Sequence, residues 1–162
     1  MTLVISRVGP ADAVTRLGPA DTVDLLAMHT RCTPQTRFAR WHGHTSEFPR
    51  AYLASITAGD DTQLALAAWH DGRLIGFASA AVIGSGVREI GILVEDAWQH
   101  RGVGGQLIGA LVDDMRRSGT TRLRAEVLAH DVALLTPLAQ LGPVSTQTSH
   151  GLVTAEVDIR AE

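Results

Sequence analysis

The stretch that most restricts the fold is Gln99-His100-Arg101-Gly102-Val103-Gly104-Gly105, in which three glycines fall within four positions. An apolar run at residues 89–94 precedes it, and an amphipathic helical pattern at residues 106–117 follows it. The run has strand length and β-branched content, which suits a strand buried on both faces. The sequence therefore predicts a glycine-rich turn that joins a buried strand to a helix.

Such a turn is suited to bind a phosphate. Glycines allow positive φ angles and let several backbone N–H groups converge, and the helix dipole adds partial positive charge there. Two known phosphate-binding motifs do not match. A P-loop needs a lysine, and the chain has none; the dinucleotide fingerprint needs glycine where Leu107 stands and an acidic residue near Arg122. The alternative is a tight turn that only starts a helix.

Composition limits the class of protein. The 162 residues suit one domain spanning 1–162, with residues 1–12 read as an additional N-terminal strand or an extension. The apolar content of 45% excludes disorder, and no run approaches the roughly 18 residues of a membrane span. A single cysteine, Cys32, and no secretion signal favour the cytoplasm. A net charge of −3 without a basic cluster argues against nucleic acid as a partner.

Periodicity and turn residues predict the order of elements along the chain. A first strand near 13–17 is followed by three helices, a hairpin around an Asp-Gly turn, and the strand that leads into the glycine turn. Asp131 is expected to cap the last helix, and a closing hairpin ends the chain. The predicted ranges are strand 13–17, helices 23–32, 34–42 and 49–57, hairpin 63–69 with 73–81, strand 87–94, helix 106–117, strand 123–128, helix 132–141 and hairpin 144–148 with 152–159.

The Gln-x-x-Gly-x-Gly spacing from Gln99 to Gly104 resembles the acyl-CoA signature of the GNAT N-acetyltransferase superfamily. The order of predicted elements from about residue 13 to residue 160 also resembles the GNAT fold. The resemblance implies an α/β (α+β) fold with a mixed, mostly antiparallel central sheet and helices on both faces. It also implies that the fourth and fifth strands splay apart to form an acyl-CoA cleft.

The resemblance further implies acetyl-CoA as the cosubstrate, with no metal. Backbone amides of the glycine turn would hold the pyrophosphate, and backbone groups of the fourth strand would bind the pantetheine arm and polarise the thioester carbonyl. Asp131 stands where the family often has an asparagine that contacts CoA. The expected cofactor-binding residues are Ile92, Leu93, Val94, Gln99, His100, Arg101, Gly102, Val103, Gly104, Gly105 and Asp131.

Glu89 is the expected catalytic residue, because it is the charged residue that heads an otherwise apolar strand and matches the family's base glutamate. The alternative is a solvated Glu89 paired with Arg88 or Arg124. Two further carboxylates, Glu95 and Asp96, are expected in solvent, because a carboxylate beside a bound pyrophosphate would be repelled. Where many family members have a general-acid tyrosine, this chain has a leucine, Leu138, and its only tyrosine is Tyr52.

The resemblance predicts transfer of an acetyl group to a primary amine by direct attack. Residues 31–43 resemble actinobacterial protein-lysine acetyltransferases, which favours a protein lysine as the acceptor. Four arginines in this region favour an anionic acceptor or an acidic protein surface: Arg31, Arg37, Arg40 and Arg50. A small-molecule amine acetyltransferase and a non-catalytic acyl-CoA-binding regulatory module are the alternatives, and a monomer and a homodimer both remain open. The spacing His29-x-x-Cys32 with His42-x-His44 is not taken as a metal site.

Overall fold

A computed structural model of the chain describes residues 9–160. The strand or extension expected over residues 1–12 therefore lies mostly outside the described residues. Its described part, residues 9–12, forms bends that lead into the first strand. No helix among the described residues is long and apolar enough to cross a membrane.

A seven-stranded sheet forms the centre of the molecule, in the spatial order β1-β2-β3-β4-β5-β7-β6. Neighbouring strands run antiparallel except β4 and β5, which run parallel. The sheet is therefore mixed and mostly antiparallel, as predicted. Its strands are β1 (Ala13–Arg16), β2 (Gln63–His70), β3 (Arg73–Gly84), β4 (Val87–Val94), β5 (Arg122–Leu128), β6 (Val144–Ser149) and β7 (Leu152–Asp158).

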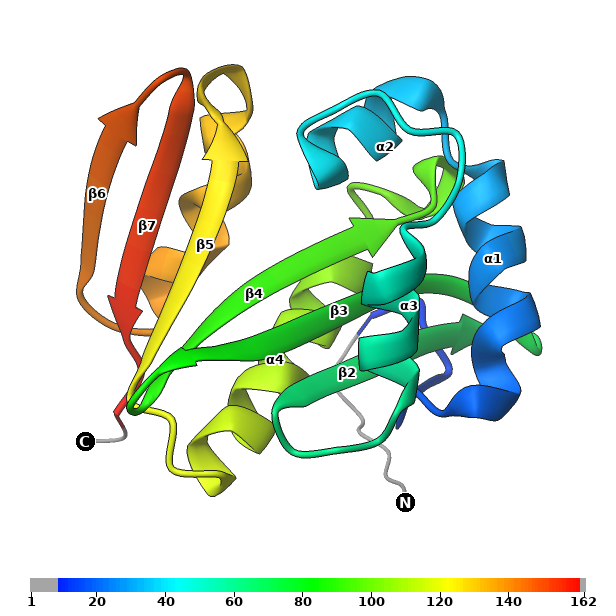
Figure 1. The fold of residues 1–162 in the computed structure, drawn as a ribbon, viewed down its shortest axis with the longest axis horizontal. Coiled ribbons are helices and arrows are strands. Elements are labelled where there is room, and N and C mark those ends of the chain that lie inside the picture. Colours follow the sequence, from blue (N-terminus) through cyan, green and yellow to red (C-terminus); the bar gives the residue numbers. More distant parts are fainter. Residues whose placement is uncertain (1–8, 161–162) are drawn as a thin grey trace.

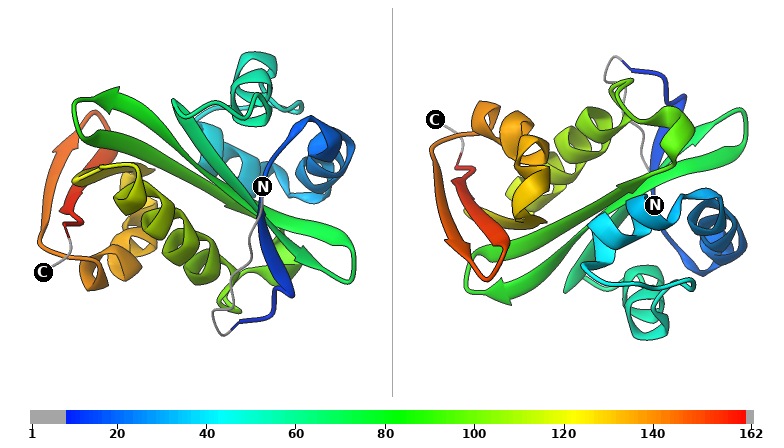
Figure 2. Two further views of the ribbon diagram at one scale, coloured as in Figure 1. Left: turned by 90° about the horizontal axis from the view of Figure 1, so that it is seen from below. Right: turned by 90° about the horizontal axis from the view of Figure 1, so that it is seen from above.

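Helices cover both faces of the sheet (Figures 1 and 2). One face carries α1 (Thr22–Arg31), α2 (Pro34–Trp41) and α3 (Arg50–Thr57). The other carries α4 (Val103–Arg117) and the 3-10 segment η3 (Ala129–Gln140). Each face has its own apolar core, one around Phe77 and Leu25 under α1–α3 and one around Leu107 and Leu111 under α4. Two short 3-10 turns, η1 (Pro19–Asp21) and η2 (Asp96–Trp98), complete the elements.

The strands β4 and β5 separate along their length. They pair only from Val87 with Arg122 to Ile90 with Ala125, and beyond that point the two strands diverge (Figure 1). Strand β7 stays paired with β5 over the whole of that strand, so β5 leaves β4 together with the closing hairpin. The predicted splay is present. It also corrects the expected burial of β4 on both faces, because residues 90–92 and 94, at and beyond the last pair with β5, are only half-buried.

The last predicted helix differs from its expected form. Residues 132–141 were expected to form a helix capped by Asp131, but the segment is a 3-10 run that begins at Ala129 and follows Leu128. Asp131 lies inside it with non-helical φ −105° and ψ 18°, so it does not cap the helix. Pro137 lies in the middle of the run, where it cannot donate an i→i−4 hydrogen bond. The apolar pattern still buries Leu135 and Leu138 against the core.

Buried His29 makes the stability of the fold dependent on pH. Burial lowers the pKa of His29, the positive charge of Arg37 lowers it further, and the imidazole Nε2 accepts a hydrogen bond from Trp41. As the pH falls below about 6.5, the unfolded chain binds this proton before the folded chain does, so stability is lost. Urea unfolding between pH 7.5 and pH 5 should show a steeper loss for the wild type than for His29→Gln. Equal slopes would contradict this assignment.

Candidate functional site

The glycine turn joins the end of β4 to the start of α4. Gly102 precedes the first helical residue with φ +97°, and His100 adopts φ +61°, a left-handed conformation that few non-glycine residues take. Alternating right- and left-handed backbone turns consecutive N–H groups toward one side and forms an anion-binding concavity. The first helical amides, at Val103, Gly104 and Gly105, have no intrahelical acceptor. The turn therefore presents main-chain donors at a helix N-terminus.

The glycines of this turn differ in what they require. A Cβ added at Gly105 would meet no atom within 4 Å, and its φ is not positive, whereas Gly102 needs its left-handed angle. Gly105→Ala should therefore raise the free energy of unfolding by about 0.5–1 kcal/mol. Gly102→Ala should cost about 1–2 kcal/mol for the same added methyl group. Urea denaturation of both variants tests the pair, and a loss of stability in Gly105→Ala would contradict it.

Gln99 connects the turn to α2. Its side-chain Nε2 donates to the Val94 carbonyl oxygen at 3.0 Å and to Thr36 Oγ1 at 3.2 Å. Thr36 Oγ1 donates in turn to Asp96 Oδ2 at 2.7 Å, and the Thr33 amide donates to Asp96 Oδ1 at 2.9 Å. The side-chain nitrogen of Gln99 is thus used within the protein. Any contact of Gln99 with a cofactor would come from its other atoms.

The two carboxylates expected in solvent are bound within the protein instead. Glu95 is only 6% exposed and accepts hydrogen bonds from Arg31 Nε at 2.8 Å and Arg73 Nη2 at 3.1 Å. Partial burial alone would raise the pKa of Asp96, but the hydrogen bonds from Thr33 and Thr36 outweigh it and lower this pKa. Neither carboxylate is free, so repulsion by a bound pyrophosphate does not force either one into solvent. Their charges are instead matched by donors from α1 and the start of α2.

The other predicted cofactor-binding residues have different surroundings. His100 and Arg101 are exposed, and the Arg101 guanidinium lies 5.2 Å from the centre of the Trp98 ring. Asp131 is at the start of η3, with its carboxylate 3.5 Å from His130 Nε2. Ile92, Leu93 and Val94 form the end of β4, beyond the last residue that pairs with β5.

Glu89 is exposed on the face of the sheet that carries α1–α3. Side chains alternate along a strand, so Glu89 shares this face with Gly91 and Leu93, while Arg88 points to the α4 side. Arg88 is buried there and donates to the Thr120 hydroxyl and the Ala80 carbonyl, so it is not a partner of Glu89.

The other expected partner, Arg124, is engaged elsewhere. Its Nη2 atom donates to Glu156 at 2.8 Å, and this hydrogen bond is the main reason that the pKa of Arg124 is raised. The charge of Glu89 adds to that increase only at longer range, and Glu89 makes no direct ion pair within residues 9–160. Its carboxylate is therefore available to an incoming group.

The end of α2 lies over the opening between β4 and β5. A Cβ added to Gly91 would lie 2.4 Å from the Arg40 guanidinium, so Arg40 packs directly on β4. His42 follows two residues after Arg40, and its Nδ1 atom lies 3.6 Å from Glu126 Oε1. Glu126 is on β5, just past the last residue that pairs with β4. Sequence reasoning did not identify Glu126, because only the splay brings this residue to the opening.

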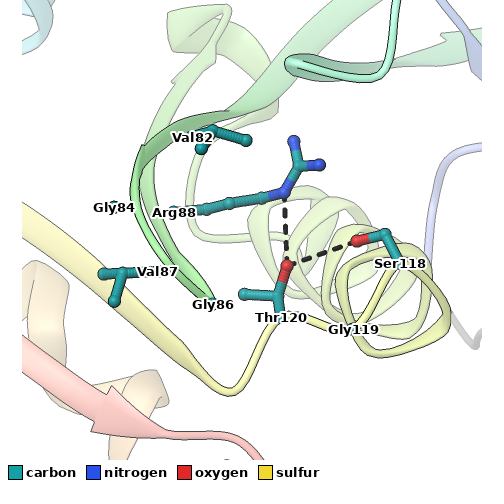
Figure 3. A pocket seen from close by; sticks show the side chains of 8 residues that line it. All are labelled: Val82, Gly84, Gly86, Val87, Arg88, Ser118, Gly119 and Thr120. Atoms are coloured by element: carbon teal, nitrogen blue, oxygen red, sulfur yellow. Dashed lines mark hydrogen bonds between the residues drawn. The ribbon is translucent and has the colours of Figure 1, made fainter.

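A shallow pocket at the other end of β4 is not part of this site. It lies where the β3–β4 turn meets the α4–β5 connection, and it is lined by Val82, Val87 and Arg88 among others (Figure 3). The Arg88 Nε atom donates to Thr120 Oγ1 at 3.2 Å, which is itself 3.2 Å from Ser118 Oγ. Since Val87 begins β4 and the glycine turn follows Val94, the two features occupy opposite ends of the strand.

Residues 9–160 contain no cluster of metal ligands: no three His, Cys, Asp or Glu side chains among them could hold one ion. Cys32 Sγ lies 3.7 Å from Met28 Sδ, and burial raises the pKa of this thiol to about 12. The site offers main-chain donors at the glycine turn and backbone groups at the end of β4 that do not pair with β5. It also offers the exposed carboxylate of Glu89 on the α1–α3 face of β4. These features suit transfer of a group from a diphosphate-containing donor.

Known proteins share both sequence and fold with this chain. Residues 24–136 match the acetyltransferase (GNAT) family. The acetyltransferase Pat of Mycolicibacterium smegmatis is 35% identical over 71 residues, which cover 44% of this chain and 21% of that protein. The matched part thus spans about a fifth of this curated relative.

Solved structures superpose over nearly the whole chain. The GNAT domain of S. lividans PAT has a TM-score of 0.81 at 23% identity, covering 90% of this chain and 89% of that one. The structure of yncA from Salmonella typhimurium with its cofactor acetyl-CoA has a TM-score of 0.73 at 18% identity, covering 92% and 94%. The fold, the glycine turn and the family match agree, and the chain belongs to the GNAT family of acyl-CoA-dependent N-acetyltransferases.

Proposed function

We propose that this protein transfers the acetyl group of acetyl-CoA to the side-chain amine of a protein lysine by direct attack. The observation that carries the proposal is the placement of Glu89. Its carboxylate, which makes no ion pair within residues 9–160, lies on the α1–α3 face of β4, and the backbone stretch Ile92, Leu93 and Val94 follows within a few residues on the same strand. A base and the backbone groups on the edge of β4 that does not pair with β5 therefore lie within a few residues of each other at the splay.

Three parts of the chain share the chemical work in this proposal. The amides at the start of α4, with Gln99, His100, Arg101 and Gly102 around them, hold the pyrophosphate of the cosubstrate, and Asp131 contacts CoA from η3. Backbone N–H groups of residues 92–94 stabilise the negative charge that develops on the thioester oxygen. Glu89 removes a proton from the incoming ammonium, directly or through one water, because an amine with a pKa near ~10.4 is otherwise protonated at neutral pH.

The departing thiolate needs no dedicated acid in this proposal. Leu138 is an apolar side chain only 2% exposed, so it cannot donate a proton from the position where many family members have tyrosine. A thiol has a pKa of about 8.5, so a water molecule can protonate the leaving group at neutral pH.

The similarity to the acetyltransferase Pat supports acetyl transfer, and the resemblance of residues 31–43 to a stretch of protein-lysine acetyltransferases supports a lysine as the acceptor. The test is incubation of the protein with isotope-labelled acetyl-CoA and a mixture of proteins and small amines, followed by mass spectrometry. Label on lysine side chains of specific proteins is the expected result. Label confined to small amines would instead establish the small-molecule alternative, and binding of acetyl-CoA without transfer would establish a regulatory module.

A further inference from the structure

The guanidinium of Arg40 lies among three aromatic rings on the acceptor side of β4. Its central carbon is 4.2 Å from the Trp41 ring centre, 4.9 Å from that of Tyr52 and 6.0 Å from that of Phe77. The Arg40 Nη2 atom donates to the Tyr52 hydroxyl, which is also hydrogen-bonded to Ser79 on β3. We call Trp41, Tyr52 and Phe77 the aromatic cage. It is built to hold a cation, because aromatic faces attract positive charge.

Arg40 is poorly satisfied in this position. Arg31 binds Glu95, and Arg37 donates to the carbonyl oxygens of Cys32 and Thr45. Arg40, in contrast, has no carboxylate partner within residues 9–160, and its Nε atom is buried without a hydrogen bond. A buried donor without a partner is destabilising, because it has lost its hydrogen bonds to water. The cage therefore holds the Arg40 side chain less tightly than three aromatic contacts alone would suggest.

The strand beneath the cage leaves room for a side chain from elsewhere. Gly91 is the β4 residue under the guanidinium, and a Cβ there would come within 2.4 Å of Arg40 Nη2. Its φ angle is not positive, so the backbone does not require glycine at this position. Because Gly91 has no side chain, a group the size of a ligand can approach β4 closely at this position. Glu89 lies two residues away on the same face, about 7 Å along the strand.

We propose that the aromatic cage is the binding site for the ammonium group of the acceptor, and that Arg40 is a resident cation which the acceptor displaces. The identity of the acceptor as a lysine rests on the proposed function; the affinity of the cage for an alkylammonium does not. A lysine side chain resembles that of arginine in having a flexible apolar stem and a terminal positive charge. It fits the same space over Gly91 and brings its nitrogen beside Glu89, while the displaced Arg40 regains hydration of its Nε atom.

Binding of n-butylammonium chloride, a lysine side-chain analogue, tests the proposal by isothermal titration calorimetry on the CoA-saturated protein. Arg40→Ala should bind this probe at least tenfold more tightly than the wild type, because the competing cation is gone. Arg117→Ala, which removes an exposed arginine on the opposite face of the sheet, should bind like the wild type. Adding Tyr52→Leu to Arg40→Ala should abolish the gain, and n-butanol, which has the same stem without the charge, should bind none of the variants measurably.

Equal or weaker binding of n-butylammonium by Arg40→Ala would overturn the proposal, as would equal binding of n-butanol. Circular dichroism and CoA titration establish that each variant is folded, and Arg40→Gln supplies a second substitution that removes the charge but keeps a longer side chain if alanine destabilises α2. Protein acetylation with labelled acetyl-CoA gives the separate answer on function. If Arg40→Ala binds the probe tightly but no lysine is labelled with any variant, the cage stands and the lysine acceptor fails.

Discussion

The Glu89→Gln variant should turn over its acceptor about 10²–10⁴ times more slowly than the wild type at neutral pH, the contribution expected of a positioned general base. Glutamine keeps the size and exposure of the side chain but cannot accept the proton. The KM for acetyl-CoA should change little, because the amides of the glycine turn lie at the other end of β4. Release of CoA, followed with a thiol reagent at saturating acetyl-CoA, measures the effect.

A matched carboxylate is available for comparison. Glu126 lies on β5 past its last pair with β4, is exposed, and contacts His42. Glu126→Gln should lower the rate less than tenfold if Glu89 is the base. The reverse order would assign the proton transfer to Glu126. Equal rates in the wild type and Glu89→Gln, with normal acetyl-CoA binding, would remove Glu89 from the mechanism.

The largest effect on stability is expected at Glu95. Glu95→Gln should lower the free energy of unfolding by about 3 kcal/mol, the lower end of the range for removing one member of a buried ion pair. The lower end applies because the Arg31 side chain, which would lose its counter-charge, is still 28% exposed and can be partly hydrated. Urea unfolding at neutral pH, followed by circular dichroism, measures the loss.

The second arginine of this cluster supplies the control. Arg73 also contacts Glu95, but its side chain is 55% exposed. Arg73→Gln should therefore cost no more than about 1 kcal/mol, as exposed ion pairs do. A loss below 1 kcal/mol in Glu95→Gln would show that the carboxylate is not held by the protein as described. Comparing the two variants shows whether the loss of stability depends on burial of the charge or only on the number of ion pairs removed.

Sequence reasoning located nearly every element because most of its signals are local. The Asp71-Gly72 turn between β2 and β3 and the Thr33-Pro34 helix start depend on neighbouring residues only. The largest error concerned η3, where apolar spacing predicted a capped helix. Pro137 and the non-helical angles of Asp131 give a 3-10 run instead, and the period of the apolar residues does not distinguish the two.

Contacts between distant parts of the chain could not be predicted in the same way. Glu95 and Asp96 looked solvated in the sequence, but their partners Arg31, Thr33 and Thr36 come from more than 55 residues earlier. The packing of the Arg40 guanidinium on Gly91 likewise depends on how α2 crosses β4. Glu126 became a site residue only because β5 leaves β4 after Ala125.

The sequence by itself determined the glycine turn, the order of the elements and the placement of Glu89 at the head of β4, because backbone preferences and apolar periodicity act over a few residues. Only the tertiary structure decided which charges are buried, which helices share a face of β4 with Glu89, and which cation lies over Gly91. Those outcomes depend on burial and on pairs of side chains that are far apart in the chain, and no local pattern encodes their distances.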